Sequence, residues 1–248
     1  MRLKLALMSL PALAVGLTVG LAACSPAGSA AQNSYVLALS WQPAFCETAA
    51  RKPECRTQTP GRADAAQFSL HGLWPQPGSR AYCGVPQSAI DDDKSGRWRE
   101  VPMQRLSQDL WERLRIAMPG TKSALERHEW IKHGSCYTDD PETYFTDSLA
   151  LLDEINASAL RDLFHSRIGS NLSGAEIRRA FEQDFGAGAG DRLRIACQRD
   201  GNRQLISEIT IGLRGEITGN PDLAALIAAS PRTDPGCPGG IVDPAGLQ

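Results

Sequence analysis

Apolar and polar positions along the chain predict the short strands and helices of a mixed α+β domain. Residues 35–41 form an apolar run typical of a buried strand. Residues 68–73 alternate with a period of two, Phe, Leu and Gly on one face and Ser, His and Leu on the other. Residues 193–197 and 205–213 also favour strands, and the Asp-Gly pair at 200–201 predicts a hairpin between them.

Apolar residues at helical spacing predict helices between these strands. One helix covers residues 106–117 and stops at a Met-Pro-Gly sequence, and another covers residues 145–155. The sequence Ser-Gly-Ala-Glu at 173–176 is a capping box, which opens a short helix ending near residue 185. Residues 123–133 predict a further helix, with Gly134 as its stop.

The N-terminal part has the composition of an export signal followed by a linker. Residues 1–23 have a short basic start and a long apolar stretch, as signal segments do. Residues 24–34 are small and polar without periodicity, which predicts a flexible tether. The folded domain is therefore expected to cover residues 35–248.

Cys24 follows the sequence Leu-Ala-Ala, which resembles the bacterial lipoprotein signal, where the cysteine after the cleaved bond is acylated. The alternative is an ordinary secretory signal cleaved near residues 29–31. Seven cysteines is an odd number, and a lipid on Cys24 would leave six that can pair completely. We therefore expect a lipid anchor on the periplasmic face of the outer membrane, with a soluble periplasmic or secreted protein as the alternative.

Length and charge limit the other possibilities. The chain has 248 residues with 42% hydrophobic content, which suits one domain with one core. It has 26 basic and 28 acidic residues and a net charge of −2, so composition alone indicates no nucleic-acid partner. Any such partner must be held by a local arrangement of charge.

Residues 126–136 concentrate the chemistry of the chain. His128, Glu129, Lys132 and His133 lie within six positions, although the whole chain has only four histidines. On a regular helix His128 lies one turn from Lys132, and Glu129 lies one turn from His133. The four polar groups can then share one space, where an imidazole transfers protons and a lysine stabilises negative charge.

A zinc site is the main alternative for this cluster. The metalloprotease motif needs its two histidines four residues apart, whereas His128 and His133 are five apart, roughly 140° around a regular helix. The three aspartates of residues 91–96 are interpreted as a solvated turn, and His165 as an ordinary surface or core residue. We therefore expect no metal and no cofactor.

A second informative stretch contains His71 and Trp74. His71 lies near the end of a predicted strand, where a rigid backbone can hold a catalytic side chain in place. Trp74 offers a flat face on which a nucleic-acid base could stack, although a tryptophan beside apolar neighbours is as often part of the core.

Together the two stretches resemble the paired signature of the T2 ribonucleases, which are exported RNA-cleaving enzymes with little base specificity. The matching residues are His71-Gly-Leu-Trp-Pro75 and His128-Glu-Trp-Ile-Lys-His-Gly-Ser-Cys136. The resemblance covers roughly residues 35–242. It implies an α+β fold in which an antiparallel sheet carries helices, with three disulfides.

The resemblance also implies roles for individual residues. His71 and His133 resemble the acid/base pair of the family. Glu129 and Lys132 resemble the residues that stabilise the transition state, and His128 resembles the histidine that holds the phosphate. The sequence does not say which of His71 and His133 is the acid.

Substrate recognition is implied less completely. Trp74 resembles the base-stacking residue, whereas Gln76 stands where many members carry an acidic residue, which leaves base preference open. RNA is the implied partner, DNA is not, and a monomer is expected. The family suggests the disulfides Cys46–Cys55, Cys83–Cys136 and Cys197–Cys237, with a polar loop inside the first.

The reaction implied by the resemblance explains these residue types. A base removes the proton of the ribose 2′-OH, which attacks the adjacent phosphorus, and an acid protonates the departing 5′ oxygen. The product is a 2′,3′-cyclic phosphate, and unperturbed imidazoles would give a bell-shaped pH profile centred near about pH 6. The rival classes are a metal-dependent hydrolase, tested with a chelator, and a lipoprotein that binds RNA without turnover.

Overall fold

The computed structural model describes residues 33–219 and 221–247. The chain divides into Met1–Ala31 and Gln32–Gln248, and the description below concerns the second unit. The predicted signal segment and Cys24 lie outside the described residues. Of the predicted tether only residues 33 and 34 are described, and Ser34 already belongs to the first strand.

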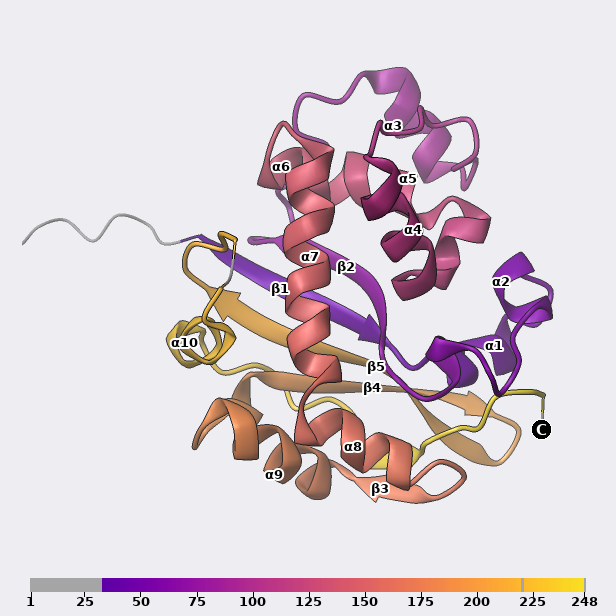
Figure 1. Cartoon of the computed structure of the whole chain (residues 1–248), viewed down its shortest axis with the longest axis vertical. Coiled ribbons are helices and arrows are strands. Elements are labelled where there is room, and N and C mark those ends of the chain that lie inside the picture. Colours follow the sequence, from indigo (N-terminus) through magenta and orange to yellow (C-terminus); the bar gives the residue numbers. More distant parts are fainter. Residues whose placement is uncertain (1–32, 220, 248) are drawn as a thin grey trace, which may run out of the picture. The chain divides into compact units, whose positions relative to one another are not determined.

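A single mixed sheet carries the fold, with strands in the order β2-β1-β5-β6-β3 and β4 paired to β5 (Figure 1). Every pairing is antiparallel except one parallel residue pair between β5 and β6. The strands are β1 (Ser34–Ser40), β2 (Ser69–Pro75), β3 (Asn171–Ser173), β4 (Leu193–Asp200), β5 (Arg203–Arg214) and β6 (Gly239–Ile241). The predicted α+β class and the predicted hairpin between β4 and β5 are confirmed.

Along the described residues, the helices lie between the first strand β1 and the last strand β6. They are α1 (Gln42–Thr48), α2 (Pro53–Arg56), α3 (Gln87–Lys94), α4 (Gln108–Ala117), α5 (Leu125–Glu129), α6 (Ser135–Tyr137), α7 (Pro141–Asn156), α8 (Ala159–Ser166), α9 (Gly174–Phe185) and α10 (Leu223–Ala229). Three predicted helices are confirmed as α4, α7 and α9. The capping box of α9 is reciprocal, because the Ser173 hydroxyl accepts from the Glu176 N–H and the Glu176 carboxylate accepts from the Ser173 N–H.

The core lies between the sheet and α7, which crosses the strands β1 and β2 (Figure 1). Phe145, Leu149 and Leu152 of α7 are fully buried, as are Leu37 of β1 and Leu73 of β2. Tyr144 fixes this packing with two hydrogen bonds, because its hydroxyl donates to the Leu73 carbonyl and accepts from the Leu73 N–H. The strand that carries His71 is thereby held firmly against α7.

All three predicted disulfides are present: Cys46–Cys55, Cys83–Cys136 and Cys197–Cys237. The segment inside the first one was predicted as a polar loop, which holds only for residues 49–52. Cys46 lies in α1 and Cys55 in α2, and both helices are short and begin with a proline in the first turn, where its fixed φ favours helix formation.

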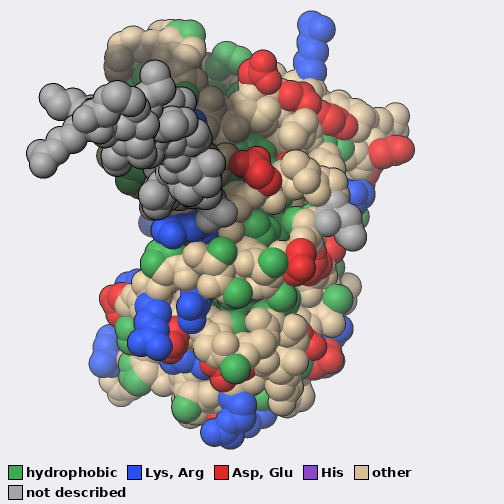
Figure 2. Space-filling view, turned by 90° about the vertical axis from the view of Figure 1, so that its left-hand side faces the viewer, with side chains coloured by type: hydrophobic (Ala, Val, Ile, Leu, Met, Phe, Trp, Pro, Cys, Tyr) green, Lys and Arg blue, Asp and Glu red, His purple; other side chains and the backbone are tan. Residues whose placement is uncertain are grey.

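Two further observations concern the described residues as a whole. None of their helices combines the length and hydrophobicity that crossing a membrane requires. On the face shown in Figure 2, hydrophobic side chains are scattered among charged ones and no histidine is visible.

Candidate active site

His71 occupies an irregular position in β2. The pairing of β2 with β1 shifts register there, since Ala38 pairs with Gly72 and Leu39 with Leu70, which leaves His71 as the extra residue of a β-bulge. The predicted strict alternation is therefore wrong at this point. Because of the bulge, the His71 and Trp74 rings lie in edge contact at 5.2 Å between centroids, although they are three residues apart.

Glu208 of β5 holds the His71 ring from one side. The Nδ1–H of His71 donates to the Glu208 carboxylate at 2.6 Å. Strand β1 lies between β2 and β5 in the sheet, so the two side chains meet across it. Burial lowers the pKa of His71, but the hydrogen bond to Glu208 and the charge of Glu129 outweigh it, and the pKa is raised.

The segment after α5 departs from the predicted helix. Residues Trp130–Gly134 form a π-turn, in which the N–H of Ser135 donates to the carbonyl of Trp130 five residues back, and the helix continues through α6. The predicted stop at Gly134 is wrong. A side chain there would collide with Trp130 and Tyr144, whose ring atoms lie 2.6 and 2.9 Å from an added Cβ, so glycine is needed for packing.

The π-turn brings together two histidines that a regular helix would separate. The rings of His128 and His133 lie 6.4 Å apart between centroids and face each other edge-on. The argument against a zinc site assumed a regular helix, on which residues five apart point in different directions. That assumption is wrong here, because a π-turn aligns residues five apart. Among residues 33–219 and 221–247, no group of three or more His, Cys, Asp or Glu side chains is arranged to hold a metal ion.

Glu129 lies at the centre of the cluster. Its buried carboxylate accepts a hydrogen bond from the indole N–H of Trp74 at 2.8 Å, and its other oxygen lies 3.7 Å from His71 Nε2 and 3.8 Å from His128 Nε2. Burial raises the pKa of Glu129, and the charges of His71 and His128 oppose that rise. Gly72 makes this contact possible, since an added Cβ would lie 1.9 Å from Glu129 Oε2.

His128 is oriented by a residue that the sequence did not single out. Its Nδ1–H donates to the carboxylate of Asp93 at 2.7 Å, and its ring stacks on Trp98 at 4.5 Å. The predicted solvated turn at residues 91–96 is wrong, because Asp93 lies in α3 and is buried. The Tyr82 hydroxyl donates to the second oxygen of the same carboxylate at 2.8 Å.

His133 also lies beside Trp74, with the Trp74 and His133 rings 5.5 Å apart between centroids. It is almost completely buried. Burial and the positive charges of Lys132, His128 and His71 lower the pKa of His133 to about 3. His71 and His133 therefore differ in proton affinity, with His71 favouring the protonated form and His133 the neutral form.

Among known protein families, the sequence of this chain matches the T2 ribonucleases. The family model described as "Ribonuclease T2 family" matches residues 32–225. The chain belongs to the ribonuclease T2 family.

Individual relatives agree with this T2 assignment. The chain is 31% identical to Ribonuclease I of Escherichia coli (strain K12) over 210 residues, which cover 76% of this chain and 78% of the relative. RNase NT in complex with 5′-AMP superposes with a TM-score of 0.51 at 22% identity, over 86% of this chain and 98% of that one. Japanese pear S3-RNase gives 0.53 at 18% identity, over 84% and 98%. These two structures show the fold alone.

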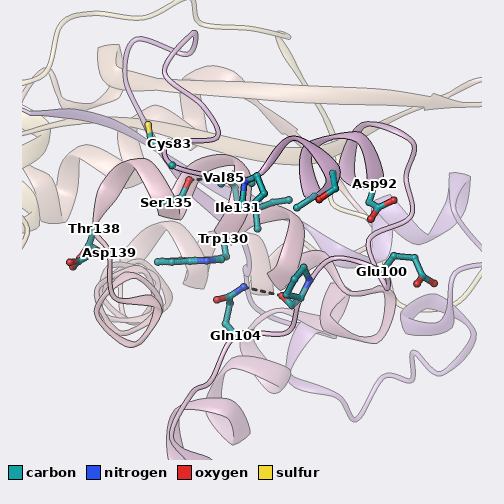
Figure 3. A pocket seen from close by; sticks show the side chains of 15 residues that line it. Cys83, Val85, Asp92, Glu100, Gln104, Trp130, Ile131, Ser135, Thr138 and Asp139 are labelled. Atoms are coloured by element: carbon teal, nitrogen blue, oxygen red, sulfur yellow. Dashed lines mark hydrogen bonds between the residues drawn. The ribbon is translucent and has the colours of Figure 1, made fainter.

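Two hollows border residues 125–135 of this T2 ribonuclease. A cavity of about 250 Å³ contains His71 and Glu208 and is also lined by Trp98 and Lys52. A larger one of about 490 Å³ lies against Trp130 and Ile131 (Figure 3). Its lining includes three carboxylates and no lysine, arginine or histidine, so a polyanion such as RNA is not expected there.

Sequence reasoning found His71, Trp74, His128, Glu129, Lys132 and His133, and the structure brings these six side chains into one cluster. It missed Glu208, Asp93 and Trp98, which orient two of the histidines. The one sequence signal for the burial of Asp93 is its position one helical turn after Ala89. No feature of the sequence around Glu208 indicates its contact with His71.

Proposed function

We propose that this member of the ribonuclease T2 family is an endoribonuclease that cleaves single-stranded RNA with little base specificity through a 2′,3′-cyclic phosphate. His133 removes the proton of the 2′-OH, and His71 protonates the departing 5′ oxygen. The observation that carries this assignment is the opposite shift of the two pKa values, lowered to about 3 for His133 and raised for His71.

The remaining cluster residues stabilise the charge that develops on phosphorus. Lys132 and the imidazole of His128 offer positive groups to the phosphoryl oxygens. The negative charge of Glu129 lies within 3.8 Å of both His71 and His128 and attracts the protonated form of each ring. Trp74 remains a candidate for base stacking, although its indole N–H is engaged with Glu129. Gln76 donates to the Trp74 carbonyl at 3.2 Å. This contact does not indicate a preference for any base.

The pH profile follows from the same shifts. The base His133 is neutral above about pH 3, and the acid His71 is protonated below its raised pKa. Activity should therefore form a broad plateau. This replaces the sequence-based expectation of a bell centred near about pH 6.

The test is cleavage of a defined RNA oligonucleotide in excess chelator, with identification of the ends. We expect 2′,3′-cyclic phosphate ends, no cleavage of the matching DNA, and a loss of at least ~10²-fold for His71→Phe or His133→Phe. His128→Phe and Lys132→Ala should cost less, and His165→Phe on α8 is the matched control. Activity that vanishes with chelator and returns with zinc would overturn the mechanism.

Export as a lipoprotein is a separate proposal, supported by the sequence around Cys24. Three disulfides in the described residues favour an oxidising compartment. Mass spectrometry of the mature N-terminus should find an acylated Cys24. An unmodified terminus near residues 30–32 would instead indicate a soluble exported enzyme.

A further inference from the structure

A third hollow adjoins the cavity that contains His71. It has a volume of about 380 Å³, and Gly96, Arg97, Trp98, Arg99 and Ser123 line it. Trp98 and Ser123 also line the cavity of about 250 Å³. The two hollows therefore meet at these residues. An RNA strand that leaves the active site past His71 would reach the third hollow next.

The charges around the third hollow are mainly positive. In the described part of the chain, Lys52, Arg99 and Lys122 form no ion pair with a carboxylate, whereas Arg97 is paired with Asp92 at 2.6 Å. The Lys52 ammonium lies 5.3 Å from the Trp98 ring centroid. Arg99 donates to the backbone carbonyl of Lys122 at 2.5 Å, whereas the Lys122 ammonium donates to the Thr57 hydroxyl.

Carboxylates also lie near this rim. Glu100 lies in the lining, Glu54 is buried and accepts a hydrogen bond from the Ser123 hydroxyl at 2.5 Å, and the buried Glu126 interacts electrostatically with Arg99. The net charge of the whole chain is −2, so the excess of cations at this rim is local. A basic groove with an aromatic side chain between two arginines is typical of surfaces that follow a single nucleic-acid strand.

We propose that the third hollow binds the phosphodiester group that follows the leaving nucleotide. It is a downstream phosphate subsite of the enzyme, with Arg99 as its principal ligand and Lys52, whose ammonium lies against Trp98, as a supporting charge. The inference rests on the proposed function, because it takes His71 as the proton donor to the leaving oxygen and the adjoining cavity as the place of the leaving nucleoside. RNA that extends beyond the leaving nucleotide on the 3′ side should therefore be cleaved faster than a dinucleotide.

The experiment compares two substrates with the purified full-length protein. One is a dinucleoside monophosphate, and the other is the same molecule with a phosphate on its terminal 3′ oxygen. The readout is the ratio of the two kcat/KM values within each variant. We expect a ratio of about ten for the wild type, because a charge-assisted contact of this kind is typically worth a factor of that order. The ratio should fall as salt is added.

Two substitutions separate this subsite from general charge effects. Arg99→Gln should bring the ratio close to one, whereas Arg113→Gln, which changes an exposed arginine of α4 paired with Asp153, should keep the wild-type ratio. A wild-type ratio of one, or a high ratio that survives Arg99→Gln, would overturn the subsite. Failure to cleave the dinucleotide and longer RNA alike would instead contradict the proposed function.

Discussion

Replacing Glu208 with glutamine tests the assignment of His71 as the acid. Glutamine keeps an oxygen that can accept the Nδ1–H of His71 but removes the negative charge, so geometry and charge are separated. Burial lowers the pKa of His71, and the 2.6 Å hydrogen bond with Glu208 is the largest influence that raises it. Glu208→Gln should therefore lower the pKa of His71.

The magnitude follows from the exposure of the pair. A hydrogen bond to a charged group contributes roughly 1.5–3 kcal/mol. The side chains of His71 and Glu208 are 33% and 22% exposed, so solvent screens the interaction and the lower end applies. About 1.5 kcal/mol corresponds to roughly a tenfold change in the ratio of protonated to neutral His71.

The assay is kcat/KM for a dinucleotide as a function of pH, which reports the groups of the free enzyme. The stabilised protonated form is fully present below the raised pKa of His71 and is lost as pH rises through it. Glu208→Gln should therefore lose about tenfold on the alkaline side and little on the acid side. Glu208→Ala also removes the orienting contact and should be slower at every pH.

Glu216→Gln is the matched control, since Glu216 follows the same strand and, among the described residues, accepts a hydrogen bond from Asn33 at an exposed position away from His71. Its profile should superimpose on that of the wild type. If the Glu208→Gln profile also superimposes, or falls by one factor at every pH, then the charge of Glu208 does not hold the proton on His71.

Three further changes test the framework around the site. Gly72→Ala would place a Cβ 1.9 Å from Glu129 Oε2 and should lower turnover by about 10²-fold, whereas Gly61→Ala, with no atom within 4 Å, should not. Cys136→Ser opens a 53-residue disulfide loop worth about 4 kcal/mol, so calorimetry should show Tm lower by roughly 8–16 °C, and an unchanged Tm would contradict this. Burial and the neighbouring Glu47 raise the pKa of Asp243 to about 7. The protonated Asp243 therefore stabilises the folded state fully below the pKa of Asp243 in the unfolded chain, and this stabilisation is lost as pH rises through about 7. Asp243→Asn should flatten the dependence of Tm on pH between about pH 5 and about pH 8, and an unchanged slope would exclude this group.

The sequence by itself determined the reactive groups and much of the regular structure. Rare residue types at fixed spacing identified His71 and the 128–133 cluster, and apolar periodicity predicted α4, α7 and the β4–β5 hairpin. These features depend on neighbours along the chain. Local patterns therefore suffice to predict them.

Tertiary structure alone decided how these groups meet. The bulge at His71 depends on pairing with β1, and the π-turn at Trp130–Gly134 is packed against Tyr144 of α7. Local sequence patterns describe regular periods of 2 and 3.6, so both irregularities reversed a sequence-based expectation.

The orienting carboxylates illustrate the same limit. Glu208 is 137 residues from His71, and only the strand order β2-β1-β5 brings them together. Asp93 follows two other aspartates, the exposed Asp91 and the partly exposed Asp92, and only the docking of α3 against His128 makes it a buried partner. Periodicity carries no information on which distant side chain fills a given space, so these contacts are set by packing.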